Sequence, residues 1–282
     1  MRSPRISSFL PLMGFLVAGS LFTAQAANIL IVAGTTGLAQ TAATVLSADL
    51  SGTNTVTIVN TGVPVSLAGY TQIYDTRFDN SPAFTNAEMT QYLAFLNAAP
   101  GNTIFLMGEN SGFNARNTPI NAFIALAGGG SISPPGSSSN NTETVTPPFT
   151  GPNSITTVKF AACGLVSSAG TGAFASSETG GGCSLFFAQQ RLPNAPNGAL
   201  VVVYDVNFIA TAPDGGAVNE VAFRQNLEQF VSSPPVGTPP TVGTPPSYSA
   251  SAPTLSEWAM IALALLLGCM GYLGLRRRFG HV

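Results

Sequence analysis

Apolar and polar positions follow two rhythms along the first 231 residues of the chain. Short runs that are almost wholly apolar, such as residues 103–107, alternate with segments whose apolar residues recur every three to four positions. The first pattern is typical of buried strands and the second of amphipathic helices. Strands are therefore predicted at 28–33, 55–59, 71–74, 103–107, 156–162, 184–188 and 199–204, and helices at 39–50, 119–126 and 217–231.

One further helix is the clearest element of the sequence. Met89, Tyr92 and Leu96 fall on one helical face, and Thr85 with Glu88 has the spacing of a capping box at the helix start. A Pro-Gly pair follows and ends the helix. Apolar strands that alternate with amphipathic helices predict an α/β fold, with a mostly parallel sheet flanked by helices.

The ordering of these segments predicts the domain organisation. Residues 27–231 are long enough for one α/β domain with its own core. Residues 232–252 follow as a Pro-rich linker, in which the sequence Val-Gly-Thr-Pro-Pro occurs at 236–240 and again at 242–246. Such a composition favours extended polyproline II, so the linker is predicted to be a semi-rigid spacer.

The N-terminus has the three parts of a secretory signal peptide. Arg2 and Arg5 precede an apolar stretch, and Ala24-Gln25-Ala26 has the small-residue pattern of a cleavage site. Residues 1–26 are therefore predicted to be removed by signal peptidase, and the mature chain to begin at Ala27.

The C-terminus contains a segment of membrane-spanning length. Residues 258–275 carry no charge and no proline, and as a helix they would extend about 27 Å, close to the ~30 Å thickness of the hydrocarbon layer. Trp258 lies at one end and three arginines, residues 276–278, follow the other. The positive-inside rule places the arginines in the cytoplasm, so the α/β domain is predicted to be extracytoplasmic.

A short motif precedes this segment, and it carries a resemblance. Residues 253–282 resemble the IPTLxxWG class of C-terminal sorting signals, which are similar in layout to the PEP-type signals of Gram-negative bacteria that exosortases handle. Ala252 and Ala259 depart from the pattern, because isoleucine and glycine are usual there. The residues that match are Pro253, Thr254, Leu255 and Trp258.

This resemblance implies a route through the cell. An exosortase-like membrane enzyme would process a chain that is first anchored in the inner membrane by its C-terminal helix. The product would then reside in the cell envelope, on the cell surface or outside the cell. The alternative is an ordinary C-terminal membrane anchor.

Charge and residue usage exclude several kinds of chemistry. The predicted domain carries more acidic than basic residues and no basic run, which argues against nucleic-acid binding. His281 is the only histidine, so the domain can form neither a Ser-His-Asp triad nor a His-rich zinc site. We predict no cofactor and no metal.

Cys163 and Cys183 are the only cysteines of the domain and are expected to form a disulfide; the alternative is two unpaired thiols.

Polar residues cluster where three predicted strands end. In parallel α/β sheets, ligands bind beyond the carboxyl ends of the strands, which makes this edge the candidate ligand-binding site. The alternative is that these side chains only cross-link loops by ion pairs. The candidates are Asp75, Arg77, Glu109, Asn110, Arg116, Asp205 and Asn207.

The order of elements also resembles the class I glutamine amidotransferase-like domains, which are flavodoxin-like. In that family, the turn that residues 108–112 would occupy presents a nucleophilic cysteine with a histidine as base. Here Asn110 stands at the turn and the domain has no histidine. The resemblance therefore implies topology without that chemistry.

Two functions follow as hypotheses. The first is a non-enzymatic envelope or surface protein, whose α/β domain serves binding or interaction. The alternative is a carboxylate-dependent hydrolase of envelope or extracellular polysaccharide, with Glu109 and either Asp75 or Asp205 as acid and base. Facing carboxyls about 5–10 Å apart in an open cleft would favour the hydrolase. Carboxylates locked by arginines would favour the binding protein.

Overall fold

The computed structural model describes residues 26–211 and 219–239. The helices are α1 (Gly37–Leu50), α2 (Asn86–Ala98), the 3-10 turn η1 (Ser111–Phe113), α3 (Asn114–Leu126), α4 (Asn207–Ala210) and α5 (Glu220–Ser232). The strands are β1 (Asn28–Val32), β2 (Thr55–Val59), β3 (Gln72–Asp75), β4 (Thr103–Met107), β5 (Ser138–Ser139), β6 (Thr142–Val145), β7 (Thr157–Lys159), β8 (Cys163–Gly164), β9 (Ala173–Glu178), β10 (Gly181–Phe187) and β11 (Ala199–Val203).

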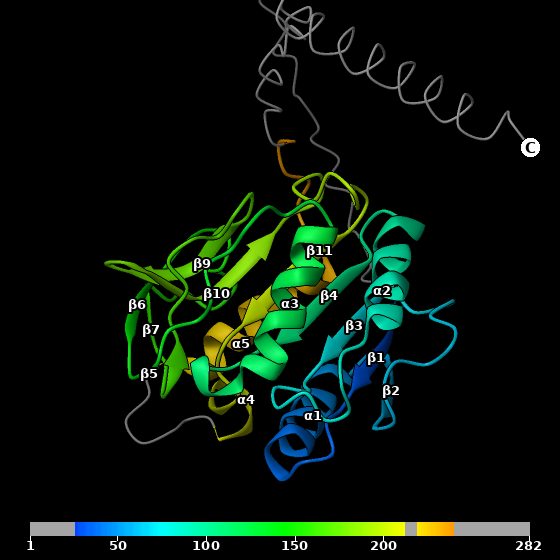
Figure 1. Cartoon of the computed structure of the whole chain (residues 1–282), viewed down its shortest axis with the longest axis horizontal. Helices are drawn as coiled ribbons and strands as arrows, with labels where there is room; N and C mark the ends of the chain where they lie inside the picture. The colour runs from blue at the N-terminus through cyan, green and yellow to red at the C-terminus, as the bar shows by residue number, and fades with distance from the viewer. Residues whose placement is uncertain (1–25, 212–218, 240–282) are drawn as a thin grey trace, which may run out of the picture. The chain divides into compact units, whose positions relative to one another are not determined.

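In the described part of the chain, nine strands form one mixed sheet in the order β2-β1-β3-β4-β11-β10-β9-β6-β7 (Figure 1). The strands from β2 to β11 pair in parallel, in the doubly wound order 2-1-3-4-5. The strands from β10 to β7 add on antiparallel. The predicted α/β class is confirmed, but the expectation of a mostly parallel sheet holds only for the part from β2 to β11.

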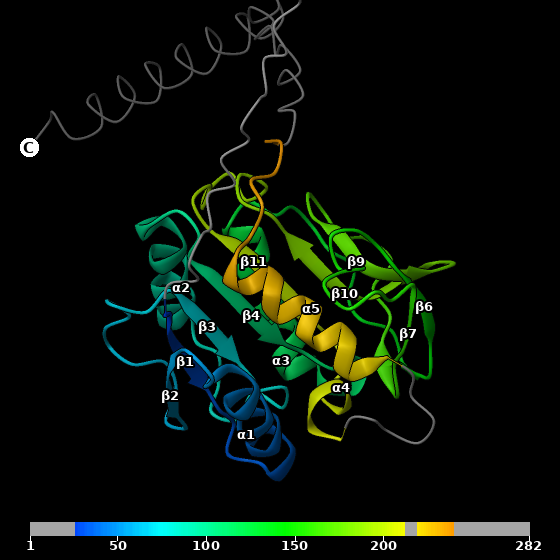
Figure 2. The ribbon, with the colours of Figure 1, turned by 180° about the vertical axis from the view of Figure 1, so that it is seen from behind.

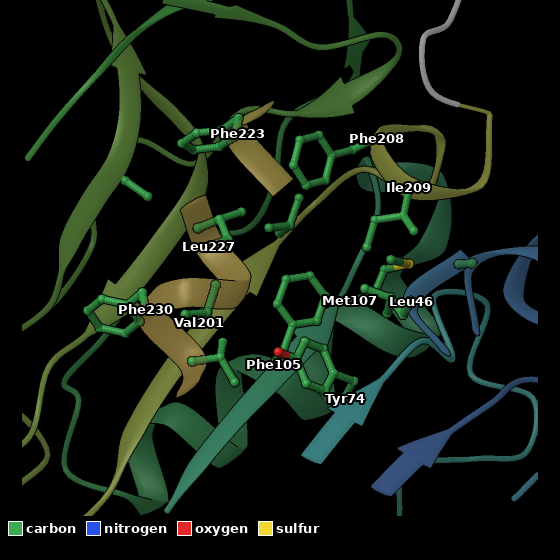
Figure 3. Close-up of a cluster of buried hydrophobic side chains, with 14 of the residues drawn as sticks. Leu46, Tyr74, Phe105, Met107, Val201, Phe208, Ile209, Phe223, Leu227 and Phe230 are labelled. Atoms are coloured by element: carbon green, nitrogen blue, oxygen red, sulfur yellow. The ribbon is translucent and has the colours of Figure 1, made fainter. Parts of the chain in front are cut away.

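Helices cover both faces of the parallel strands. Figure 1 shows α2 and α3 in front of the sheet, and the view from behind in Figure 2 shows α1, α4 and α5 on the other face. Successive strand residues point to opposite faces, so Ile29 and Ile31 pack with α1, α4 and α5, whereas Leu30 and Val32 pack with α2 and α3. Figure 3 shows the first of these cores, where side chains of three helices meet β3, β4 and β11.

The α2 helix begins as the sequence predicts. Thr85 Oγ accepts a hydrogen bond from Glu88 N at 3.3 Å, and Glu88 Oε2 accepts one from Thr85 N at 2.9 Å, which completes the capping box. The α3 helix differs from the prediction, because it starts at Asn114 and carries Pro119 inside. This earlier start places Arg116 in the first helical turn, where its guanidinium group reaches the last residues of β3 and β4.

The antiparallel half of the sheet is less visible in the sequence. The β7 strand is shorter than the predicted strand 156–162, β10 begins three residues earlier than predicted, and β6 and β9 had no prediction. Cys163 and Cys183 form the expected disulfide, with their Cα atoms 6.0 Å apart. It ties β8, in the small β5–β8 sheet, to β10 of the large sheet.

The beginning of the predicted linker is attached to the domain. The α5 helix ends at Ser232, and Gly237 N then donates a hydrogen bond to Gln189 O at 2.9 Å. Gln189 Nε2 donates to Pro234 O at 2.9 Å, and Arg191 Nη1 donates to Thr238 O at 3.2 Å. The described part of the linker thus packs along residues 189–191.

Candidate functional site

The candidate residues come together at one edge because β3, β4 and β11 are neighbours in the sheet. Asp75 is the last residue of β3, Glu109 lies two residues beyond β4, and Asp205 lies two residues beyond β11. The three carboxylates are almost completely buried, with residue exposures of 0%, 2% and 0%. They divide into two groups with different partners.

Asp75 lies between two buried arginines. Its Oδ2 is 2.7 Å from Arg77 Nη2, and its Oδ1 is 2.9 Å from Arg116 Nη2. Tyr92 also donates its hydroxyl to Asp75 Oδ2 at 3.0 Å. Burial alone would raise the pKa of Asp75, but Arg116 and Arg77 outweigh it and hold this pKa well below its usual range. The two arginines therefore favour the ionised form of Asp75.

The two arginines are held in turn by neighbouring elements. Arg77 Nη1 reaches Glu88 Oε1 at 3.1 Å, so the capping glutamate of α2 also pairs with this arginine. Arg116 Nε donates to Met107 O at 3.0 Å, which joins α3 to the end of β4. Both guanidinium groups lie over the ring of Phe84, at 5.7 and 5.1 Å from its centroid. The roles of Glu88 and Tyr92 were missed in the sequence, although the capping box had singled out Glu88.

Glu109 is bound by main-chain and amide donors. Its Oε2 accepts from Val206 N at 2.8 Å, and its Oε1 accepts from Asn110 N at 3.0 Å and from Asn110 Nδ2 at 2.9 Å. Asn110 also donates to Ala162 O at 3.1 Å. Burial raises the pKa of Glu109, and these hydrogen bonds oppose the increase.

Asp205 has a similar environment. Its Oδ1 accepts from Asn207 N at 2.9 Å and from Phe208 N at 3.3 Å, and its Oδ2 accepts from Ala161 N at 3.2 Å. Burial is the main reason that the pKa of Asp205 lies well above its usual range, and the neighbouring Glu109 raises it further. Asn207 Nδ2 donates to Ala161 O at 3.3 Å, which fixes the loop before β8.

All three carboxylates are bound by groups of the protein itself. Asp75 is paired with arginines, and Glu109 and Asp205 have their oxygens on hydrogen-bond donors of the chain itself. Two grooves of the described surface have linings that include none of the seven candidate residues. Asp75 therefore has the arginine partners that the ion-pair alternative describes, whereas Glu109 and Asp205 are held by hydrogen bonds from main-chain N–H groups.

Glu143, which the sequence did not single out, is a further buried carboxyl group. It is 0% exposed on β6, where Cys183 N donates to its Oε1 at 2.8 Å and Ser176 Oγ donates to its Oε2 at 2.6 Å. Its carboxylate lies close to both sulfurs of the Cys163–Cys183 disulfide. Burial raises the pKa of Glu143 to about 8.

Comparison with known proteins bears on the C-terminus. A family model described as the IPTL-CTERM motif matches residues 250–278, which include Pro253, Thr254, Leu255 and Trp258. The chain therefore carries a C-terminal sorting signal, as expected for an exported protein. No curated protein matches the sequence.

The structure of the tail lies outside the described residues, which end at residue 239. The predicted membrane helix 258–275 and the conformation of the sorting motif are therefore not described. Within residues 26–211 and 219–239, no helix is both long enough and apolar enough to cross a membrane.

Asp75→Asn is expected to lower the free energy of unfolding by about 3–5 kcal/mol, because Arg116 and Arg77 lose a buried counter-charge. Asp49→Asn is the matched control, since Asp49 pairs with Arg224 at 2.6 Å but its side chain is 26% exposed. This control substitution should lower the free energy of unfolding by only about 0–1 kcal/mol. Urea unfolding of the full chain, followed by circular dichroism, measures both. Equal losses in the two variants would contradict the central role of Asp75.

Stability is expected to fall as the pH rises from about 5 to 9. Glu143 has a folded-state pKa of about 8 against a usual value of 4.5, so the folded state retains a proton that the unfolded state has lost. Its stabilising contribution is complete below pH 4.5 and is lost as the pH approaches 8. At about 1.4 kcal/mol per pKa unit, the loss is roughly 3–5 kcal/mol.

Glu143→Gln separates this contribution from those of the other buried acids. Glutamine keeps an acceptor for Cys183 N and cannot ionise, so the variant should lose less stability than the wild type over the same pH range. Glu228, whose pKa burial also raises to about 8, remains in both proteins. If the free energy of unfolding changed equally with pH in the wild type and in Glu143→Gln, Glu143 would not be the source of the pH dependence.

Proposed function

We propose that this chain is an exported envelope or surface protein that is sorted through its C-terminal signal and displays a non-catalytic α/β domain for binding or interaction. The match to the IPTL-CTERM motif at residues 250–278 carries the first part of the proposal. The second part is supported by the burial and internal pairing of the candidate carboxylates.

The proposed route uses two membrane enzymes. Signal peptidase removes residues 1–26, and an exosortase-like enzyme then acts on the tail. Until that second step, the helix 258–275 anchors the chain in the inner membrane. The final location of the processed chain is the cell envelope, the cell surface or the medium.

The amidotransferase-like resemblance contributes only topology to this proposal. The order 2-1-3-4-5 of the parallel strands is the flavodoxin-like order, which proteins of many unrelated functions share. Asn110 caps η1 by accepting a hydrogen bond from Gly112 N at 3.0 Å, at the turn where that family places its nucleophile. A carboxamide in this position is not a nucleophile, so we infer no acyl-transfer chemistry.

One observation favours the alternative, a carboxylate-dependent hydrolase of polysaccharide. Glu109 and Asp205 influence each other electrostatically, and burial raises the pKa of both, as a general acid requires. However, a substrate would have to displace Val206 N or Ala161 N from these oxygens and open a buried region. The binding function therefore has the stronger support.

The intact mass of the protein isolated from its native host tests the sorting proposal. We expect a chain that begins at Ala27 and ends between the Pro-rich linker and Trp258, with any attached anchor visible as added mass. A chain that extends through Arg278 would reduce the tail to a plain membrane anchor.

The non-catalytic proposal predicts that wild-type protein and the Glu109→Gln variant release equally little reducing sugar from envelope polysaccharide. Reducing-end assays on both proteins provide the measurement, and melting temperatures confirm that both are folded. Sugar release by the wild type that Glu109→Gln abolishes at an unchanged melting temperature would establish the hydrolase instead.

A further inference from the structure

The opposite edge of the sheet, where the parallel strands begin, has a different character from the carboxyl edge. A groove of about 1080 Å³ lies there, between the starts of β1 and β3, the turn before β4 and the segment that follows α5. None of the described residues that line it carries a charged side chain. Its amide side chains are Asn28, Asn54, Gln72, Asn102, Gln189 and Gln229.

Several of these amides use their N–H groups within the protein. Asn28 Nδ2 donates to Gly69 O at 3.0 Å, Asn102 Nδ2 donates to Phe95 O at 2.7 Å, and Gln189 Nε2 donates to Pro234 O at 2.9 Å. Each of these amides keeps a carbonyl oxygen that the protein does not use in a described hydrogen bond. The groove is therefore rich in neutral hydrogen-bonding groups, because each of these amides keeps its oxygen and a second N–H that no described hydrogen bond uses, and such groups are complementary to hydroxyls.

Gln72 supplies an independent sign of a missing partner. It is 4% exposed, it lines the groove, and its Oε1 has no hydrogen-bond partner among the described residues. An unpaired buried amide oxygen is costly in a folded protein. Because Gln72 lines the groove and its terminal amide torsion is soft, a hydroxyl-bearing ligand there can supply the missing donor once the amide rotates.

An apolar groove continues from the polar one. It has a volume of about 530 Å³ and shares Thr71, Ala99 and Asn102 with its neighbour. Leu67, Tyr70 and Phe95 line it, between the segment 65–71 and α2. The two together offer neutral acceptors next to an apolar and partly aromatic surface.

We propose that this double groove binds a neutral oligosaccharide, an inference that rests on the binding function proposed above. Sugar hydroxyls donate to carbonyl acceptors, and the C–H faces of pyranose rings fit apolar and aromatic surfaces. A charged ligand would find no opposite charge on a described lining side chain. Signal-peptide removal would add a single α-ammonium group at Ala27, whose nitrogen lies 3.0 Å from Asn54 Oδ1.

A peptide that extends the sheet is a poorer fit. The main chain at this edge is already paired, since Thr71 N donates to Asn28 O at 3.0 Å and Thr103 N donates to Thr71 O at 3.2 Å. Thr55 N likewise donates to Ala27 O at 2.9 Å. Recognition in the groove must therefore come from side chains, as is common for sugars, and not from strand addition.

The test uses the full chain in a detergent that contains no sugar. It is applied to an array of neutral α- and β-linked oligosaccharides, acidic oligosaccharides and Gly-Ala peptides, and calorimetry then gives Kd for the best neutral oligosaccharide. Gln72→Met and Gln229→Ala should each weaken binding about three- to tenfold, the effect of one lost neutral hydrogen bond. Gln40→Ala is the matched control, because Gln40 is an exposed amide on α1 outside the groove, and it should leave Kd unchanged.

Three results would overturn the assignment: no neutral oligosaccharide is retained, acidic glycans or peptides bind better, or both groove variants bind as the wild type does. Chromatography of the same glycans after incubation separates this failure from that of the proposed function. Cleaved glycans would contradict a non-catalytic domain, whereas intact and unbound glycans would refute only the saccharide ligand.

Discussion

The ion pairs around Asp75 are the interaction on which the carboxyl edge of the sheet depends. One carboxylate at the end of β3 receives Arg77 from its own loop, Arg116 from α3 and the hydroxyl of Tyr92 from α2. Through the arginines it also reaches Glu88 and the last residue of β4. A single buried charge of this kind is costly to desolvate, so all its partners must be in place together. The loops and helices above the parallel strands are therefore fixed by charge as well as by apolar packing.

The two edges of the sheet differ in how their polar side chains are bound. At the carboxyl edge, Glu109 and Asp205 complete the closure by binding main-chain N–H groups of Val206 and Ala161. At the opposite edge, the main chain is paired but the amide side chains are not fully used. In doubly wound sheets the carboxyl edge is the usual place for a ligand. In this chain the carboxylates of that edge are buried and bound within the protein, and the neutral groove to which we assign a ligand lies at the opposite edge.

The described domain and the matched sorting motif suit a protein whose role is to be displayed. The IPTL-CTERM match gives the chain a processing signal separate from the domain. Our proposal therefore places transport and binding in different segments, and each can be tested without disturbing the other.

The sequence by itself determined the features that depend on neighbouring residues. The sorting motif, the capping box and the apolar runs of β1, β2, β4 and β11 are local patterns, and the two cysteines of the domain left one possible disulfide within it. Tertiary structure alone decided the rest. Apolar runs record burial on both faces and not strand direction, so β10 looked like a parallel strand although it is antiparallel. The short polar strands β6 and β9 have little pattern of their own. Asp75 and Arg116 are far apart in the sequence, and whether such charges face a ligand or each other depends on how the elements that carry them pack.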